Sequence, residues 1–215
     1  MKKVVLATTN INKVKRLKRL LHDLDIELIS IDAFDIKVSE PNETGLTCGS
    51  IALEKAAHYV QFLPKSTLVL TQDDTIAFDG VSEDDNPGVH IKEPVINKYG
   101  EFTDELAIKY YTELADKYGG HIPMTFHYGH AIAMKSENKR NTTKVLSSES
   151  KLETRLVNKS NKEIVKGYFL SSIMKVKIND EWVYHNDLTE EQLIEIDGDL
   201  HESIKILLKG FERNE

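Results

Sequence analysis

Apolar residues along the chain form short continuous runs and longer stretches with helical spacing. Residues 4–7 are an apolar run typical of a buried strand, and apolar residues then recur every three or four positions from Val14 to Leu24, the pattern of an amphipathic helix. The same patterns predict further strands at 26–31, 67–71, 125–134, 144–156, 173–178 and 182–184, and helices at about 47–63, 104–117 and 200–208. Strands and helices are intermixed, so we predict one mixed α/β domain over residues 1–215.

Three polar segments interrupt these elements. Residues 38–45 and 80–92 read as loops, and the charged turn 136–141 joins two of the strands into a hairpin. The strand at 67–71 runs directly into Gln72, Asp73 and Asp74, so it is expected to end in two carboxylates. Loops and strand ends of this kind often carry function.

Composition excludes several classes of protein. Apolar residues make up 40% of the chain and charged residues 29%, which is typical of a soluble globular protein. The apolar run near the N-terminus is too short for a signal peptide or a membrane span, and Cys48 has no partner for an internal disulfide, so we predict a cytoplasmic protein. The net charge of −7 argues against general nucleic-acid binding. A small anionic ligand remains compatible with local lysines or a bridging divalent cation.

A polar turn follows the first strand and opens the first helix, with Thr8, Thr9 and Asn10 before Lys13. The N-terminus of a helix offers free N–H groups and partial positive charge, and a lysine adds a full charge, so this turn could hold a phosphate. The alternative is an ordinary strand-to-helix turn in which Asn10 caps the helix.

Four carboxylates are the second candidate group. Glu40 and Glu43 lie on one predicted loop and Asp73 and Asp74 on another, and a fold that joins them would create an oxygen-rich site suited to Mg²⁺. Neighbouring strand residues point to opposite faces, so one aspartate could bind metal while the other orients water. The alternative is that all four are ordinary surface residues.

Taken in order, four segments resemble the inosine triphosphate pyrophosphatase family. Residues 4–13 resemble its phosphate-binding strand and turn, with Thr9 at a position where glycine is usual. Residues 43–47, followed by Ala52, Lys55 and Ala56, resemble its Glu-Thr-Gly-x-Thr helix start. Asp73-Asp74-Thr75 resembles its Asp-Asp-Ser element, and Pro87-Gly88 its Pro-Gly turn.

This resemblance implies a fold, a reaction and a set of site residues. The family fold is an elongated, mixed, twisted sheet flanked by helices, with two lobes and a central cleft, and its members form homodimers. The family hydrolyses nucleoside triphosphates to monophosphate and pyrophosphate. Carried over to this chain, Glu43 and Asp74 would hold Mg²⁺, and Asp74 would position the attacking water with help from Asp73. The substrate would contact Thr8, Thr9, Asn10, Lys13, Thr75, Tyr168 and His201.

The second half of the chain departs from the family pattern. The base-holding Phe-Gly-Tyr-Asp-Pro segment falls on residues 166–170, which keep Gly167 and Tyr168 but place Phe169 at the aspartate position. The Ser-His-Arg motif falls on Leu200-His201-Glu202, which reverses the charge of the arginine. Further polar family positions are replaced by Ile196, Glu93, and Ser50 with Ile51. We therefore expect the pocket for a 6-oxopurine to be altered.

Three functions follow from these observations. The first is a Mg²⁺-dependent nucleoside-triphosphate pyrophosphatase with altered or relaxed base preference. The second is a weak or inactive member that binds a nucleotide, or a partner protein, on the same fold. The third is a hydrolase of another phosphoanhydride. Convergence of Glu43 and the two aspartates separates the first from the second, because a fold alone does not fix a function.

Overall fold

The computed structural model describes residues 2–34, 38–136, 142–161 and 164–211. The chain forms two compact units, each made of segments that are distant in sequence. Unit 1 comprises Met1–Asp74, Tyr128–Ser150 and Asp197–Glu215, and unit 2 comprises Thr75–His127 and Lys151–Ile196. We describe each unit by itself, and the predicted two lobes, the cleft between them and the single domain over residues 1–215 stay predictions.

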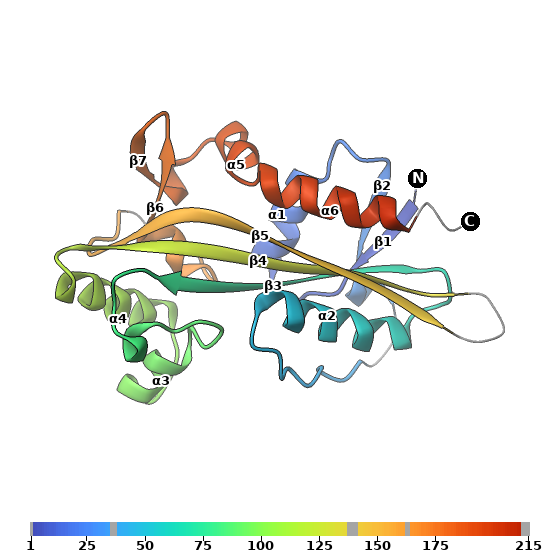
Figure 1. Ribbon diagram of the computed structural model, residues 1–215, viewed down its shortest axis with the longest axis horizontal. Helices are drawn as coiled ribbons and strands as arrows, with labels where there is room; N and C mark the ends of the chain where they lie inside the picture. The colour runs from blue at the N-terminus through green and yellow to red at the C-terminus, as the bar shows by residue number, and fades with distance from the viewer. Residues whose placement is uncertain (1, 35–37, 137–141, 162–163, 212–215) are drawn as a thin grey trace. The chain divides into compact units, whose positions relative to one another are not determined.

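The described residues contain seven strands and six α-helices (Figure 1). The strands are β1 Lys2–Leu6, β2 Ile26–Ser30, β3 Leu68–Phe78, β4 His121–Lys135, β5 Thr143–Val157, β6 Met174–Ile178 and β7 Glu181–Tyr184. The helices are α1 Ile11–Leu20, α2 Cys48–Tyr59, α3 Glu93–Tyr99, α4 Asp104–Lys117, α5 Glu190–Ile196 and α6 Gly198–Gly210. Five short 3₁₀ helices complete the described elements, among them Phe169–Ser172.

The strands form one mixed sheet in the order β2-β1-β3-β4-β5-β6-β7. β1 pairs in parallel with both β2 and β3, whereas β6 pairs antiparallel with β5 and β7. Val4, Val5 and Leu6 of β1 are all fully buried, as expected for a strand covered on both faces. The sheet confirms the predicted mixed class.

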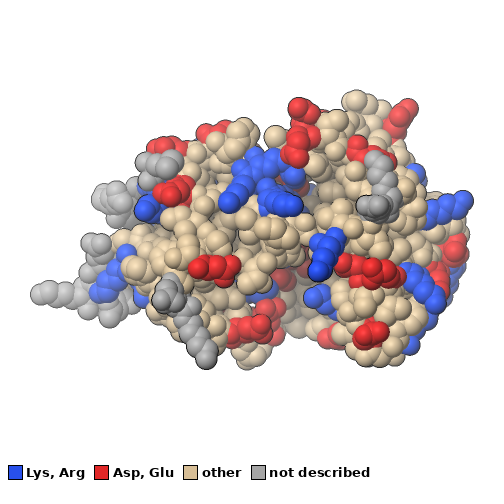
Figure 2. All heavy atoms as spheres, turned by 180° about the vertical axis from the view of Figure 1, so that it is seen from behind, with Lys and Arg blue, Asp and Glu red and all other residues tan. Residues whose placement is uncertain are grey.

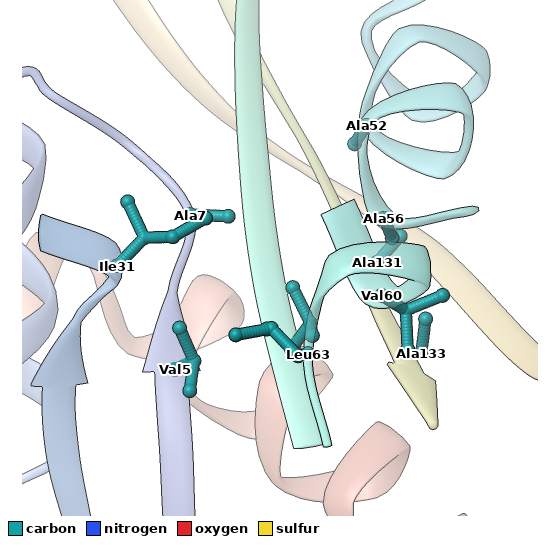
Figure 3. Close-up of a cluster of buried hydrophobic side chains, with 10 residues drawn as sticks. Val5, Ala7, Ile31, Ala52, Ala56, Val60, Leu63, Ala131 and Ala133 are labelled. Atoms are coloured by element: carbon teal, nitrogen blue, oxygen red, sulfur yellow. The ribbon is translucent and has the colours of Figure 1, made fainter. Parts of the chain in front are cut away.

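In unit 1, helices cover both faces of the strands. Helix α2 lies on one side, and α1 and α6 lie on the other (Figure 1). The α2 side is a cluster of mostly small apolar residues that includes Val5 and Val69 from the strands and Ala52 and Ala56 from the helix (Figure 3). Because alternate strand residues face opposite sides, Leu6 and Leu70 point toward α1 and α6.

A glycine allows the start of α2 to approach the sheet closely. A Cβ atom at Gly129 of β4 would overlap the backbone of Cys48 and Gly49, so only glycine fits there without moving the helix. Thr47 caps the helix in a capping box with Ser50, as the sequence predicts for Thr47. The N-terminus of α2 is thereby fixed against β4.

The opposite face of unit 1 contains a buried polar group beneath α6. His130 is fully buried, and its Nε2 lies 2.8 Å from the hydroxyl oxygen of Ser203 on α6. Ser148 of β5 contacts the same hydroxyl. Burial lowers the pKa of His130 to about 4, because the charged ring would lose its hydration. The ring is therefore neutral in the fold at neutral pH.

Unit 2 is organised around aromatic side chains. Tyr111 of α4 is fully buried, stacks on Phe169 with ring centroids 5.6 Å apart, and donates a hydrogen bond to the carbonyl oxygen of Ile91. Phe102 meets Phe169 edge-on, with centroids 6.0 Å apart. Phe169 is thus a core residue of unit 2.

Most predicted elements are confirmed, and one prediction is wrong. The helix predicted at 104–117 has those bounds, and the predicted hairpin strands are present as the longer β4 and β5. The prediction that a strand ends before Asp73 is wrong, because β3 continues to Phe78. Aspartate has a weak strand propensity and therefore favours a strand end, but cross-strand pairing overrides that propensity here. Most of the predicted turn at 136–141 lies outside the described residues.

Two short helices were not predicted. Helix α3 begins with Glu93 and Pro94 and ends at Gly100, which has a φ of 86°, and its seven residues are too few to show a period. Helix α5 is also seven residues long and buries none of its residues. None of the described helices is both long and apolar enough to span a membrane.

Charge is distributed unevenly over unit 1. On the face shown in Figure 2, acidic and basic side chains are interspersed, and one group of Lys and Arg side chains gathers over α1. This helix carries Lys13, Lys15, Arg16, Lys18 and Arg19 and has no acidic residue in its first turn. Half of the ten residues of α1 are thus basic, in a protein whose net charge is −7.

Histidine 130 predicts a loss of stability in acid. The unfolded ring has its ordinary pKa of 6.5 and takes up a proton as the pH falls below that value, whereas the folded ring stays neutral down to about 4. Protonation therefore favours the unfolded state. We expect the free energy of unfolding to fall by up to about 3 kcal/mol more in the wild type than in His130→Gln between pH 6.5 and 4.

Denaturant unfolding of both proteins at several pH values measures this difference. Between pH 7 and 8 the ring is neutral in both states, so the offset between the two proteins should be constant there. Parallel curves for wild type and variant down to pH 4 would contradict the assignment.

Candidate active site

The turn between β1 and α1 is built by its own side chains. The Oδ1 of Asn10 accepts hydrogen bonds from the backbone N–H groups of Asn12 at 2.9 Å and Lys13 at 3.4 Å, and so caps α1. The hydroxyl oxygen of Thr8 accepts from the N–H of Asn10 at 3.2 Å. Asn10 is therefore the capping residue that the sequence allowed. Thr8 is half-buried and Thr9 is exposed, and phosphate binding by this turn stays a prediction.

The alternation of β3 sends its two aspartates to opposite faces. Thr71 donates to the carbonyl oxygen of Ala52 in α2, which places residues 69, 71 and 73 on the α2 side. Asp73 accordingly contacts Lys55 of α2, and Asp74 contacts Lys13 and Arg16 of α1. The sequence prediction that the two carboxylates diverge is confirmed by these contacts.

Asp74 is surrounded by donors. Lys13 Nζ lies 3.2 Å from its Oδ2, and Arg16 Nη2 lies 3.3 Å from Oδ1 and 3.4 Å from Oδ2. The side-chain amide of Gln72 donates to Oδ1 at 2.9 Å. Burial opposes ionisation of this carboxyl, but Lys13 and Arg16 outweigh burial and lower the pKa of Asp74. Asp74 is therefore ionised at neutral pH.

Lys55 joins the other two predicted carboxylates. Its Nζ lies 2.7 Å from Asp73 Oδ1 and 3.2 Å from Glu43 Oε1. Burial disfavours the charged ammonium, but Asp73 and Glu43 overcome that effect and raise the pKa of Lys55. Lys13 also lies 3.9 Å from Asp73. Lys13, Arg16 and Lys55 thus balance Glu43, Asp73 and Asp74, and we call these six residues the charge cluster.

The loop that carries Glu43 is fixed by a neighbour of Lys55. Glu54 accepts hydrogen bonds from the N–H of Thr44 at 2.9 Å, the hydroxyl of Thr44 at 2.7 Å and the N–H of Gly45 at 3.2 Å. Glu149 of β5 accepts from the Thr47 hydroxyl at 2.9 Å and the Gly49 N–H at 3.0 Å. Residues 44–49 are therefore held at both ends, and Glu43 enters the charge cluster from a fixed loop.

Among the residues that the structure describes, no group of three or more His, Cys, Asp or Glu side chains is arranged to hold a metal ion. Gln72 is 3% exposed, and its side-chain nitrogen donates a hydrogen bond to Asp74. Its side-chain oxygen, Oε1, has no hydrogen-bond partner in the structure. Glu43 and Asp74 could hold a cation if oxygens from a substrate or from water completed its coordination.

Glu40 does not join the charge cluster. It lines a separate pocket of about 270 Å³ with Thr8, Thr9, Asp32, Ser39 and Tyr59. Burial raises the pKa of Tyr59, and the negative charge of Glu40 adds to that rise. The pocket thus adjoins the turn before α1 and has an acidic wall.

The remaining residues predicted to contact the substrate belong to both units. His201 lies 3.1 Å from Asp23, a residue just after the C-terminus of α1. Lys13 is in the first turn of α1, and the helix axis rises by roughly 10 Å between Lys13 and the last residue, Leu20. The structure therefore does not bring His201 to the charge cluster. Thr75 and Tyr168 belong to unit 2, and Tyr168 meets the ring of His185 edge-on. Their roles stay predictions.

Arg16 and Gln72 were missed by sequence reasoning. Arg16 lies three residues after Lys13 and so on the same side of α1, which is a signal the sequence does contain. Gln72 lies two residues before Asp74 and shares its face of β3, although Gln72 alone resembles any strand residue. Neither residue type is distinctive, and only the tertiary contacts single them out.

Comparison with known proteins identifies relatives of this chain. The sequence model of the Ham1 family matches residues 4–176. The HAM1 protein of Coxiella burnetii has a TM-score of 0.64 and 22% identity over 98% of this chain and 100% of that one. The Staphylococcus aureus Ham1 protein has a TM-score of 0.59 and 22% identity over 100% of both chains.

A third solved structure is the nucleoside-triphosphatase / dITP/XTP pyrophosphatase from Mycobacterium abscessus. It has a TM-score of 0.59 and 20% identity, over 95% of this chain and 96% of that one. No curated protein matches the chain. At these identities the structural likeness shows a shared fold, and the predicted family resemblance is confirmed by the match over residues 4–176.

The hydrogen bonds accepted by Glu54 predict that this side chain protects the backbone amides next to Glu43 from hydrogen exchange. In Glu54→Gln the loop loses the charged acceptor for two backbone N–H groups, and a neutral amide accepts more weakly. We expect faster hydrogen exchange at the amides of Thr44 and Gly45, measured by NMR, with little change elsewhere. Glu113→Gln is a control, since Glu113 is also a hydrogen-bonded carboxylate on a helix but belongs to unit 2. Unchanged exchange at both amides would show that other contacts hold the loop.

Proposed function

Because the chain belongs to the Ham1 family, we propose that it is a Mg²⁺-dependent nucleoside-triphosphate pyrophosphatase that releases nucleoside monophosphate and pyrophosphate. The observation that carries this proposal is the charge cluster, in which Lys13, Asp74 and the pair of Lys55 and Glu43 converge from three distant segments. The name of the Mycobacterium abscessus relative, a dITP/XTP pyrophosphatase, supports the same reaction class. The metal, the base preference and a homodimer are our proposals.

The charge cluster suits a triphosphate bound with a hard cation. Magnesium is usually bound by one or two carboxylates together with substrate phosphates, and Glu43 and Asp74 are carboxylates of this kind. The unpartnered oxygen of Gln72 adds a neutral acceptor beside Asp74. When bound, the cation would neutralise phosphate charge and polarise the phosphorus–oxygen bonds. Glu43 and Asp74 would hold it, as the family resemblance implies. Substrate phosphates would supply further ligands, since the described residues contain no group of three or more side chains arranged to hold a metal ion.

The protein groups supply the rest of the chemistry. Lys13 is a fixed positive charge at the N-terminus of α1, where it can stabilise the negative charge that grows on the leaving pyrophosphate. Lys55 can do the same from the α2 side. Asp74 is ionised, so it can orient a water molecule in line with the α-phosphorus, and Asp73 assists from the neighbouring strand position. Thr8, Thr9, Asn10 and Thr75 would complete the substrate contacts.

The base-reading half is proposed to be relaxed. Phe169 is buried against Tyr111, so it cannot accept or donate a hydrogen bond at a base edge. Glu202 is exposed and forms an ion pair with Lys205 of its own helix at 2.9 Å. A site that reads a base through hydrogen bonds discriminates because unpaired buried groups are costly, about 1–3 kcal/mol each. Tyr168 and His201 remain as proposed substrate contacts from the resemblance.

A second candidate is nucleotide binding with weak or no turnover. The observation that favours it is the saturation of Asp74 by Lys13, Arg16 and Gln72, which leaves no oxygen of this carboxylate without a donor. Thermal stabilisation by a nucleotide without pyrophosphate release would identify this function. A hydrolase of another phosphoanhydride would instead release phosphate or pyrophosphate from a substrate that is not a nucleotide.

Asp74→Asn tests the reaction. The amide keeps the shape of the side chain but can neither bind a cation strongly nor orient water as a carboxylate does. We expect pyrophosphate release to fall by roughly a hundredfold or more, the range seen when one stabilising group is removed from a transition state. The measurement is pyrophosphate release from a panel of nucleoside triphosphates, with Mg²⁺ and with excess chelator.

Asp85→Asn is the matched control. Asp85 is also an ion-paired aspartate, held by Lys117 at 2.6 Å, but it lies in unit 2 and outside the proposed machinery. It should keep wild-type rates. Full activity of Asp74→Asn, or equal rates in chelator, would refute the metal–carboxylate mechanism.

The residues at the proposed base-reading positions, Phe169 and Glu202, predict little discrimination between nucleoside triphosphates with different bases. We expect rates for inosine triphosphate within about a hundredfold of those for ATP and GTP, because the groups that would discriminate by about 1–3 kcal/mol each are missing. The measurement is kcat/KM for each nucleotide under identical Mg²⁺ conditions. A larger preference for inosine or xanthosine triphosphate would show that other residues read the base.

A further inference from the structure

Arg16 has contacts that the proposed reaction does not use. Its Nη2 lies 3.3 Å and 3.4 Å from the two oxygens of Asp74, and its guanidinium lies over the ring of Tyr128, 4.5 Å from the centroid. The side chains of Arg16 and Asp74 are 12% and 17% exposed. The pair is thus partly withdrawn from water, and the ring fixes the plane of the guanidinium.

Asp74 has two basic side chains in contact with its carboxylate, Lys13 and Arg16. Lys13 also lies 3.9 Å from Asp73, whereas Arg16 contacts Asp74 in the charge cluster. Gln72 occupies Oδ1 as a neutral donor. A divalent cation that coordinates Asp74 would lie beside the guanidinium, and the two positive charges would repel each other.

A second carboxylate lies within the electrostatic reach of Arg16. Asp197, at the start of α6, is 3% exposed and is paired with Arg19 at 3.3 Å. Burial raises the pKa of Asp197, and the charges of Arg16 and Arg19 oppose that rise. Arg16 therefore acts on two aspartates on one face of unit 1, one in the charge cluster and one beneath α1.

We propose that Arg16 is a positioning residue that serves as the internal counter-ion of Asp74 in the free protein, and that a divalent cation binds Asp74 only by displacing it. This inference rests on the proposed function for the identity of Asp74 as a metal ligand. The displaced guanidinium is then available to the substrate's phosphates, which planar arginine forks bind well. Arg16 would make metal binding weak without substrate and strong with it.

The test is Mn²⁺ binding without nucleotide, followed by the loss of the free-ion signal in electron paramagnetic resonance. The full-length protein is titrated as wild type, Arg16→Gln and Arg16→Lys, with circular dichroism confirming the fold. We expect Arg16→Gln to bind Mn²⁺ at least roughly fivefold more tightly, the lower range of a typical coupling between two sites. Arg16→Lys, which keeps the charge, should remain close to the wild type.

Arg19→Gln is the matched control, because Arg19 is on the same helix and pairs with an aspartate at the same distance, 3.3 Å. Its Mn²⁺ affinity should equal that of the wild type. Adding Asp74→Asn to Arg16→Gln should abolish the gain. If Arg16→Gln does not fold, Arg16→Met retains the apolar contact with Tyr128 and tests the same charge.

Three results would overturn the inference. They are an unchanged or weaker affinity in Arg16→Gln, an equal gain in Arg19→Gln, and a gain that persists with Asp74→Asn. Pyrophosphate release is measured separately, so the two proposals can fail independently. A fivefold gain in a protein that releases no pyrophosphate supports the counter-ion and refutes the reaction. Release without any gain does the reverse.

Discussion

The candidate site depends on the alternation of side chains along β3. Two neighbouring residues of a strand cannot face the same layer, so Asp73 meets the α2 side and Asp74 the α1 side. Each aspartate is therefore served by the helix on its own face, Lys55 on one and Arg16 on the other, while Lys13 lies within 4 Å of both. Two adjacent strand positions thus gather charges from both layers of unit 1.

That arrangement has a cost which the protein offsets locally. Partly buried charges lose hydration, and removing one partner leaves the others uncompensated. Here each carboxylate has at least one cation within 3.4 Å, and Glu54 and Glu149 fix the loop that delivers Glu43. The close approach of α2 to β4 at Gly129 fixes the N-terminus of α2, the helix that carries Lys55. The charge cluster is consequently built on rigid elements, and its members are aligned before a ligand arrives.

The fold was more predictable than the contacts within the site. Long periodic segments such as 104–117 were found from pattern alone, whereas the seven-residue α3 and α5 carry too little period to detect. The motif residues Lys13, Glu43, Asp73 and Asp74 could be predicted from order and spacing, and the structure brings them together. Arg16, Gln72 and Glu54 could not, because their importance comes from what tertiary packing places beside them. His201 was also predicted from a motif, and it contacts Asp23, beyond the C-terminus of α1, so its role in substrate binding stays a prediction.

Phe169, which the resemblance aligns with the base-holding aspartate of the family, has an apolar environment. In unit 2 this ring stacks on Tyr111 and meets Phe102, so its neighbours demand an apolar, close-packed side chain. An aspartate there would be buried among aromatic rings without a partner, at a cost of several kcal/mol, so reversion at this single position could not restore base reading. The phosphate half is under a different constraint, because cation–carboxylate contacts on α1, α2 and β3 require charge at each position. The proposed relaxation of base selection is compatible with this difference, because Phe169 belongs to the aromatic core of unit 2 while the charge cluster of unit 1 keeps its own contacts.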